Sequence, residues 1–267
     1  MATVSRDPAT GKTQITISDG ALIPDRGEAS TFSAWRISFF GALGLLILLP
    51  LVSPDPYLEI LAFVPDGIFR TFQVTTISIF FALIIGLLTG LGRISRITVI
   101  NRIATVYVEV IRGIPLLVQL FYIYFALGRF LSVDRMVAAI TAMSVCYGAY
   151  MGEIFRAGIQ AIPKGQMEAA LALGMSRGQA MRLVILPQTM RIILPPIGNE
   201  FIALLKDSSL VSIVAVSDLL RRGREYASTT FYYFESYTMV ALIYLVITLF
   251  FSKAVAIMEE RLEHRGR

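Results

Sequence analysis

Long uncharged runs divide this chain into segments. Residues 37–54 contain no charged side chain, and neither do residues 71–92. A helix over the second run is about 33 Å long at about 1.5 Å per residue, which is enough to cross the roughly 30 Å apolar core of a bilayer. Shorter uncharged runs follow at 113–128, 136–152 and 236–252. The runs are too long and too uniformly apolar for the alternating strands of a membrane barrel, so the pattern predicts spanning helices.

A further, less apolar span is predicted over residues 188–205, where Arg191 and Glu200 interrupt the apolar pattern. Basic residues orient the spans, because Lys and Arg are enriched in cytoplasmic loops. Segment 93–102 carries three arginines and no acidic residue, and segment 156–191 carries five basic residues against one acidic residue. With six spans, both basic loops and both chain termini are therefore expected in the cytoplasm.

The domain organisation follows from these spans. Residues 1–35 form a polar tail that is too long and acidic to be the start of a cleaved signal peptide, so residues 36–54 are expected to remain as an N-terminal transmembrane helix. Residues 68–258 form the main membrane domain, and residues 259–267 form a cytoplasmic tail. The expected fold class is an all-α polytopic membrane protein with about six transmembrane helices.

Composition excludes several classes of function. Hydrophobic residues make up 55% of the 267 residues and charged residues 16%, whereas a soluble domain has about 25% charged residues. One cysteine, Cys146, and one histidine, His264, exclude a disulfide framework and a Cys/His zinc site, and His264 lies too close to the C-terminus to favour a catalytic triad. Membrane orientation accounts for the net charge of +5, so nucleic acid is not an expected partner.

Two glycine-containing segments could indicate a nucleotide site or close helix packing. Gly11-Lys12-Thr13 resembles the end of a phosphate-binding loop, but Arg6 stands where that loop needs its first glycine. The chain is therefore not expected to bind a nucleotide there. Gly86 and Gly90 lie four residues apart in an apolar run, and this spacing favours close packing against another helix.

The loop between the fourth and fifth predicted spans carries the most information. Pro163 ends one helix, and residues 165–173 then predict a short helix that Gly174 closes as a C-cap. Residues 176–179 have the Ser-x-x-Gln pattern of a capping box that opens a second helix. A helix–glycine–helix elbow of this kind suits docking into a cleft of another protein. An ordinary connector on the membrane surface is the alternative interpretation.

Four motifs in this part of the chain resemble a known family. Glu168-Ala169-Ala170, Gly174 and then Val184-x-Leu186-Pro187 resemble the EAA signature of ABC importer permeases, with Val184 where isoleucine is usual. Three more stretches resemble the polar amino-acid branch of the histidine/glutamine type: residues 112–119, 153–159 and 205–210. The resemblance begins near residue 72 and leaves out the tail and the first span.

The resemblance implies a permease subunit in the bacterial cytoplasmic membrane, with a five-helix importer core and one extra N-terminal helix. It implies a binding-protein-dependent importer of polar amino acids, in which the chain is not itself an enzyme and carries no cofactor, because ATP and Mg bind to the partner ATPase. The implied partners are a cytoplasmic ABC ATPase dimer, a second identical or homologous permease, an extracytoplasmic amino-acid-binding protein and membrane lipid. The coupling helix lies at 163–180, with Lys164, Glu168, Ala169, Ala170, Gly174, Met175, Ser176 and Gln179 as the coupling residues.

Polar residues within spans are the candidates for a substrate path, because a membrane protein tolerates them mainly where they line a cavity. Glu200 and Asp207 share one helical stripe, and Asn199 and Lys206 share the next. Substrate contact, gate and subunit interface all remain open for Asn199, Glu200 and Lys206, whereas a structural i,i+3 ion pair with Arg156 is favoured for Glu153. The candidate path or gate residues are Arg112, Gly113, Pro115, Gln119, Glu153, Asn199, Glu200, Lys206, Asp207 and Ser208; no catalytic or metal-ligating residue is expected.

The alternative function is an ion-coupled secondary amino-acid carrier. The sequence shows no internal repeat of the kind that marks many such carriers, which counts against this reading. An intramembrane hydrolase is disfavoured because no predicted span contains a histidine. The sequence does not indicate which amino acid is carried.

Overall fold

The computed structural model describes residues 2–6, 13–17, 33–127 and 133–264 and divides into two units, Met1–Ser38 and Phe39–Arg267. In the first unit, strands β1 (Ala2–Arg6) and β2 (Thr13–Ile17) pair antiparallel, with Ala2 opposite Ile17. These strands lie in the segment that the sequence predicts as a polar tail. The described part of the second unit contains helices and their connections, so the all-α membrane domain is confirmed.

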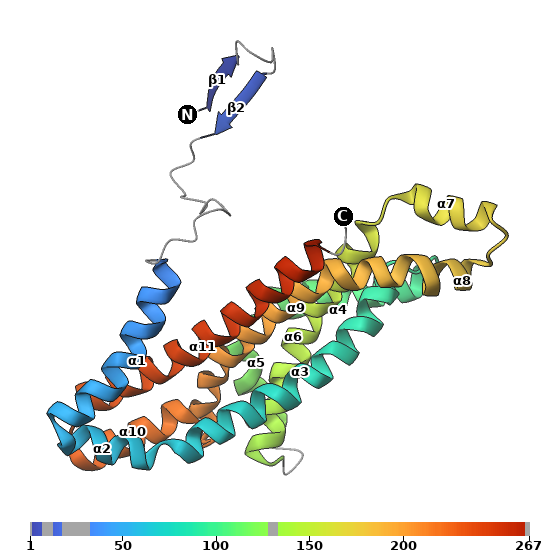
Figure 1. The fold of residues 1–267 in the computed structure, drawn as a ribbon. Helices are drawn as coiled ribbons and strands as arrows, with labels where there is room; N and C mark the ends of the chain where they lie inside the picture. The colour runs from blue at the N-terminus through green and yellow to red at the C-terminus, as the bar shows by residue number, and fades with distance from the viewer. Residues whose placement is uncertain (1, 7–12, 18–32, 128–132, 265–267) are drawn as a thin grey trace. The chain divides into compact units, whose positions relative to one another are not determined.

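The helices follow one another with short connections (Figure 1). Helix α1 begins in the first unit and continues into the second. The elements in order are α1 (Ala34–Val52), α2 (Pro54–Phe63), α3 (Pro65–Arg93), α4 (Thr98–Gly113), α5 (Leu116–Phe121), the π-helical turn η1 (Tyr122–Leu127), α6 (Arg135–Gln160), α7 (Lys164–Ala172), α8 (Arg177–Ala180), the π-helical turn η2 (Met181–Ile185), α9 (Leu186–Asp207), the 3₁₀ turn η3 (Ser208–Val214), α10 (Leu219–Thr230) and α11 (Tyr233–His264).

Length and apolar composition identify four spanning candidates in the described chain: α1, α2 with α3, α6 and α11. A fifth arises if α4 and the segment from α5 to Ala126 count together, although they are bent by 102°. The span predicted from residues 113–128 therefore corresponds to the second arm of a bent pair whose first arm is α4. Helix α9 is 22 residues long and includes the predicted span at 188–205. Because of its charged side chains, it is not among the four spanning candidates.

Proline chemistry explains the bend between α4 and α5. A proline disfavours helical backbone in the residue before it, and Ile114, which precedes Pro115, is extended with φ −110° and ψ 128°. Helix α4 therefore ends at Gly113, and α5 begins in a new direction at Leu116. Hydropathy does not show this break, because the residues on both sides of it are apolar.

The most extensive helix contact among the described residues joins α3 and α6. Gly86 and Gly90 lie at this contact, as their spacing predicts. A Cβ atom at Gly86 would lie 2.3 Å from the Met151 Cβ, and one at Gly90 would lie 2.7 Å from the Phe155 Cβ. Small residues allow this approach, and van der Waals packing then holds two helices together inside a bilayer, where the hydrophobic effect supplies little.

A second apolar cluster packs α2, α10 and α11 together, at the opposite end of the bundle from α7 and α8 (Figure 1).

Asp218 lies outside the apolar helices and caps α10 by accepting hydrogen bonds from the Leu220 and Arg221 backbone amides. The Asp218 side chain is fully buried, and the Tyr244 hydroxyl donates a hydrogen bond to its carboxylate at 3.4 Å. Burial raises the pKa of this carboxyl from its ordinary 3.8 to about 6.

Gly86→Ala is expected to destabilise the protein. Alanine has a higher helix propensity than glycine by about 1 kcal/mol, but the added Cβ would also lie 2.9 Å from the Met151 carbonyl carbon. Overpacking costs about 1–3 kcal/mol and more where backbone cannot move aside, so the unfolding temperature in detergent should fall. Gly41→Ala is the matched control, because nothing lies within 4 Å of its added Cβ. Equal unfolding temperatures for the two variants would contradict the packing argument.

Asp218→Asn is expected to change how stability depends on pH. Asn is also a good N-cap but does not ionise. Because the pKa of Asp218 is raised in the folded state, folded protein binds the proton more tightly than unfolded chain between about pH 4 and pH 6. This contribution, worth about 3 kcal/mol, is present below pH 4 and is lost as the pH rises through 6.

The measurement is the unfolding temperature of both proteins from pH 4 to pH 7. Wild type should lose stability relative to Asp218→Asn across the window. Parallel curves would show that the Asp218 carboxyl does not titrate there, and other carboxyl groups cancel because they are shared by both proteins.

Candidate functional site

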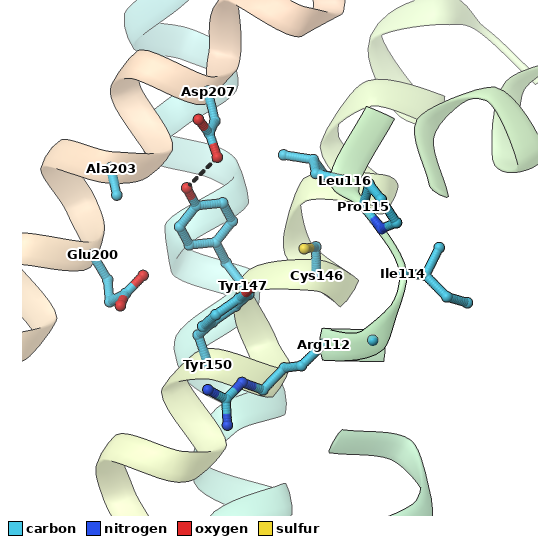
Figure 2. Close-up of a pocket in the computed structure, with 11 residues that line it drawn as sticks. Arg112, Ile114, Pro115, Leu116, Cys146, Tyr147, Tyr150, Glu200, Ala203 and Asp207 are labelled. Atoms are coloured by element: carbon cyan, nitrogen blue, oxygen red, sulfur yellow. Dashed lines mark hydrogen bonds between the residues drawn. The ribbon is translucent and has the colours of Figure 1, made fainter. Parts of the chain in front are cut away.

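A cavity of about 440 Å³ lies between the α4–α5 bend, α6 and α9 (Figure 2). The bend contributes five residues to its lining, and each of the two helices contributes three. The lining residues are Arg112, Gly113, Ile114, Pro115 and Leu116 from the bend, Cys146, Tyr147 and Tyr150 from α6, and Glu200, Ala203 and Asp207 from α9. Five of the candidate path residues are therefore in the lining: Arg112, Gly113, Pro115, Glu200 and Asp207.

Gln119 stabilises the bend between α4 and α5 through hydrogen bonds of its side chain. Its side-chain Nε2 donates to the Ile111 and Ile114 carbonyl oxygens, both at 2.8 Å. A helix leaves its last carbonyls without intrahelical partners, so this amide stabilises the broken end of α4. Gln119 is buried and does not line the cavity. Gln119, a candidate path residue in the sequence, lines a separate and smaller pocket in the structure.

Helix α9 presents two carboxylates to the cavity. Glu200, Ala203 and Asp207 lie three and four residues apart, which places them on one helix face, and Figure 2 shows them along one wall. The Tyr147 hydroxyl donates to Asp207 Oδ2 at 2.8 Å. The sequence-based stripe of Glu200 and Asp207 is thus present in the structure.

The remaining candidates on or after α9 lie elsewhere. Asn199 is exposed and does not line the cavity, and Lys206 is exposed beside a different, smaller pocket. Ser208 is buried and donates to the Leu205 carbonyl oxygen at 2.7 Å. One-residue steps along a helix turn successive side chains to different faces, which separates these three from the cavity.

Arg112 lies opposite the carboxylate wall. Its guanidinium lies 5.0 Å from the centroid of the Tyr150 ring, a cation–π distance. Its Nη1 is 3.6 Å from Glu153 Oε1, which is longer than a hydrogen bond. Its position in the last turn of α4 also favours a cation, because the carbonyl end of a helix is negative.

Glu153 lies next to the cavity and connects three helices. Arg156 Nε lies 2.6 Å from Glu153 Oε2, which is the ion pair that the sequence spacing predicts. Arg93, at the end of α3, is paired with the other carboxylate oxygen. Arg93 was not expected as a partner, because sixty residues separate it from Glu153 and a pattern within one helix does not reveal it.

Tyr147, Tyr150 and Cys146 are cavity residues that sequence reasoning missed. They lie in an uncharged run, which gives no sign of a polar wall. A usable signal was present in the spacing: Tyr147, Tyr150 and Glu153 recur at every third position and so share one side of α6.

The elbow has the local structure that its sequence predicts. Gly174 has φ +82°, and a Schellman motif closes α7: the Met175 amide donates to the Ala170 carbonyl and the Gly174 amide to the Leu171 carbonyl. A capping box opens α8, with the Ser176 amide donating to the Gln179 side chain at 2.9 Å and the Gln179 amide donating to the Ser176 hydroxyl at 3.3 Å.

Most of the predicted coupling residues are on the elbow surface. Met175 is half-buried and Ala170 is buried, at 3% exposed. Leu173 is 81% exposed, so an apolar side chain projects beside the glycine. The exposed members of the predicted set are Lys164, Glu168, Ala169, Gly174, Ser176 and Gln179.

The elbow joins two helices that line the cavity. Three residues separate the end of α6 from the start of α7, and α8 continues through η2 directly into α9. A Cβ atom at Gly158 of α6 would lie 2.1 Å from Ile193 Cγ2 of α9. The two helices are therefore in close contact just beyond the elbow.

Comparison with known proteins agrees with these features. A family model described as "Binding-protein-dependent transport system inner membrane component" matches residues 82–264. The glutamine transport system permease protein GlnP of Escherichia coli (strain K12) is 39% identical over 201 residues, covering 74% of this chain and 92% of that protein. The arginine transport system permease protein ArtQ of Bacillus subtilis (strain 168) is 39% identical over 198 residues, covering 72% and 90%.

Solved structures agree on the fold. A crystal structure of an amino acid ABC transporter with histidines is 42% identical, with a TM-score of 0.73 over 76% of this chain and 96% of that chain. An inward-facing MetNI methionine ABC transporter is 21% identical with a TM-score of 0.65, a likeness of fold alone. None of these similarities supports the ion-coupled alternative. The chain therefore belongs to the family of binding-protein-dependent transport system inner membrane components and is a permease subunit of an ATP-binding-cassette transporter.

Proposed function

We propose that this chain is the membrane subunit of an importer that moves polar amino acids across the bacterial cytoplasmic membrane. The position of the elbow is the observation that carries the proposal, because the elbow lies between the two helices that form the cavity walls. The names of its relatives, which include glutamine, arginine and L-cystine transport permeases, support an amino acid as the cargo.

The cavity has suitable groups for both ends of an amino acid. Arg112 binds the carboxylate, and Glu200 and Asp207 bind the ammonium from the opposite wall (Figure 2). A charge leaving water for a membrane domain costs several kcal/mol unless protein groups pair with it. Arg112 remains available for this role, because Glu153 already has shorter contacts with Arg93 and Arg156.

Coupling runs from the elbow to the cavity through α6 and α9. The exposed elbow residues, including Glu168, Ala169 and Gly174, dock into a groove of a cytoplasmic ATPase. When the ATPase pair closes around ATP, the elbow moves and tilts the two attached helices. Tyr147 and Tyr150 on one helix and Glu200 and Asp207 on the other then move relative to the bend, which alternates access to the cavity.

The remaining partners follow from this assignment. ATP and Mg bind to the ATPase chains, a second permease completes the translocation path, and an extracytoplasmic binding protein delivers the amino acid. The elbow and both chain termini face the cytoplasm, an orientation that the basic loops support.

Reconstituted uptake tests the proposal. Proteoliposomes that contain this chain with its ATPase should accumulate labelled amino acid only when ATP and the binding protein are both supplied. Omitting ATP while imposing a sodium or proton gradient should leave uptake at background. Gradient-driven uptake by this chain alone would refute the proposal and establish a secondary carrier.

Gly174→Ala tests the elbow, because a non-glycine residue in left-handed backbone costs about 1–2 kcal/mol. The added Cβ meets nothing within 4 Å, so the strain acts through the angle between α7 and α8. ATP-driven uptake should fall about fivefold or more, while membrane insertion is unchanged.

Gly165→Ala, in the helix that Gly174 closes, is the control, since its added Cβ also meets nothing within 4 Å and its φ is not positive. It should keep wild-type uptake. If both variants transported at the wild-type rate, the glycine geometry would have no part in coupling.

A further inference from the structure

The cavity lining contains one cation and two carboxylates. Arg112 supplies the positive charge, and Glu200 and Asp207 supply the negative charges. A zwitterionic amino acid brings one carboxylate and one ammonium. The carboxylate of the amino acid pairs with Arg112, and its ammonium pairs with one of the two wall carboxylates. The second wall carboxylate is then left without an opposite charge in the lining.

Nearby cations do not neutralise this excess on α9. Lys206 faces a different pocket, beside Ser209 and Tyr244. Arg93 and Arg156 are paired with Glu153 behind Arg112, so they strengthen the positive end of the cavity. The cavity is therefore dipolar, with cations around the end of α4 and two carboxylates along α9.

The two carboxylates differ in how many hydrogen bonds and ion pairs the protein gives them. Asp207 accepts a hydrogen bond from Tyr147. Across the described ranges, Glu200 has neither a hydrogen bond nor an ion pair within 4 Å; it is half-buried, and Arg112 is an opposite charge that acts on it. Glu200 is therefore the carboxylate that is available to bind a cation of the solute.

Spacing along α9 indicates the shape of the solute. Glu200 and Asp207 are seven residues apart, which is about 10.5 Å along the helix axis. A single ammonium group reaches one of them. Two cations joined by several methylenes, as in arginine, lysine or ornithine, can approach both while the carboxylate remains at Arg112.

We propose that the cavity selects amino acids with a cationic side chain over neutral or acidic ones of the same size. The inference rests on the proposed function and specifies its substrate class. A neutral side chain leaves one wall carboxylate unmatched, and an acidic side chain adds a third negative charge beside the wall. Either arrangement leaves a charge without an opposite partner, which is less favourable than the matched pair that a cationic side chain makes.

Arginine and citrulline provide the direct comparison, because they have nearly the same shape and differ in side-chain charge. The purified permease–ATPase complex in nanodiscs, without the binding protein, isolates the selectivity of the permease. Apparent Kd values come from the rise in unfolding temperature with amino-acid concentration. Arginine should bind at least about tenfold more tightly than citrulline, given the coupling energies of close charge pairs.

Three variants locate the selectivity. Glu200→Gln should bring the citrulline-to-arginine Kd ratio close to one, and Glu200→Asp, which keeps the charge, should retain most of the preference. Asp66→Asn should leave the ratio unchanged, because it removes the same charge from a residue outside the cavity whose side chain is 85% exposed. The ATPase rate of each complex confirms that it is assembled.

Each outcome bears on one claim. Equal wild-type affinity for arginine and citrulline, or an unchanged ratio in Glu200→Gln, overturns the charge selection and leaves amino-acid transport standing. Tighter binding of glutamate than of arginine also overturns it. If an assembled wild-type complex binds and transports none of the amino acids, the proposed function fails and the inference fails with it.

Discussion

A partly buried carboxylate at the ends of several helices attracts cations from each of them, and Glu153 shows how much of the structure depends on such an attraction. This single side chain on α6 pairs with Arg93 at the end of α3 and with Arg156 one turn along, and it lies 3.6 Å from Arg112 at the end of α4. These side chains are partly exposed, so water shares in solvating the charges, but removing one partner still leaves Glu153 with fewer opposite charges. The cluster therefore holds three helix segments in one arrangement beside the cavity.

Two backbone features set the positions of the cavity walls beside this cluster. Glycines bring α3 into contact with α6, and the break before Pro115 turns the chain so that the end of α4 faces α9. Gln119 then donates to the carbonyl oxygens that the break exposes. The positive and negative walls face each other because a bend and a close helix contact coincide.

The elbow shares two of those walls. Because α6 enters it and α9 leaves it, a displacement of α7 and α8 acts on the Tyr147–Asp207 contact, which connects the same two helices. The exposed Leu173 and the left-handed Gly174 form the outer corner. In the proposed mechanism, short connections join the docking surface to the cavity walls: three residues separate α6 from α7, and the turn η2 links α8 to α9.

The amino-acid sequence by itself determined the apolar spans and the elbow, because burial in a bilayer and helix capping depend on residues close together in the chain. It also placed Glu200 and Asp207 on one face and paired Glu153 with Arg156, since these are contacts within one helix. The break at Pro115 is local too, although hydropathy does not show it. Only the tertiary structure decided the Arg93–Glu153 pair and the tyrosine side of the cavity. These features depend on which helices meet, and contacts between residues tens of positions apart leave no periodic signal in one sequence.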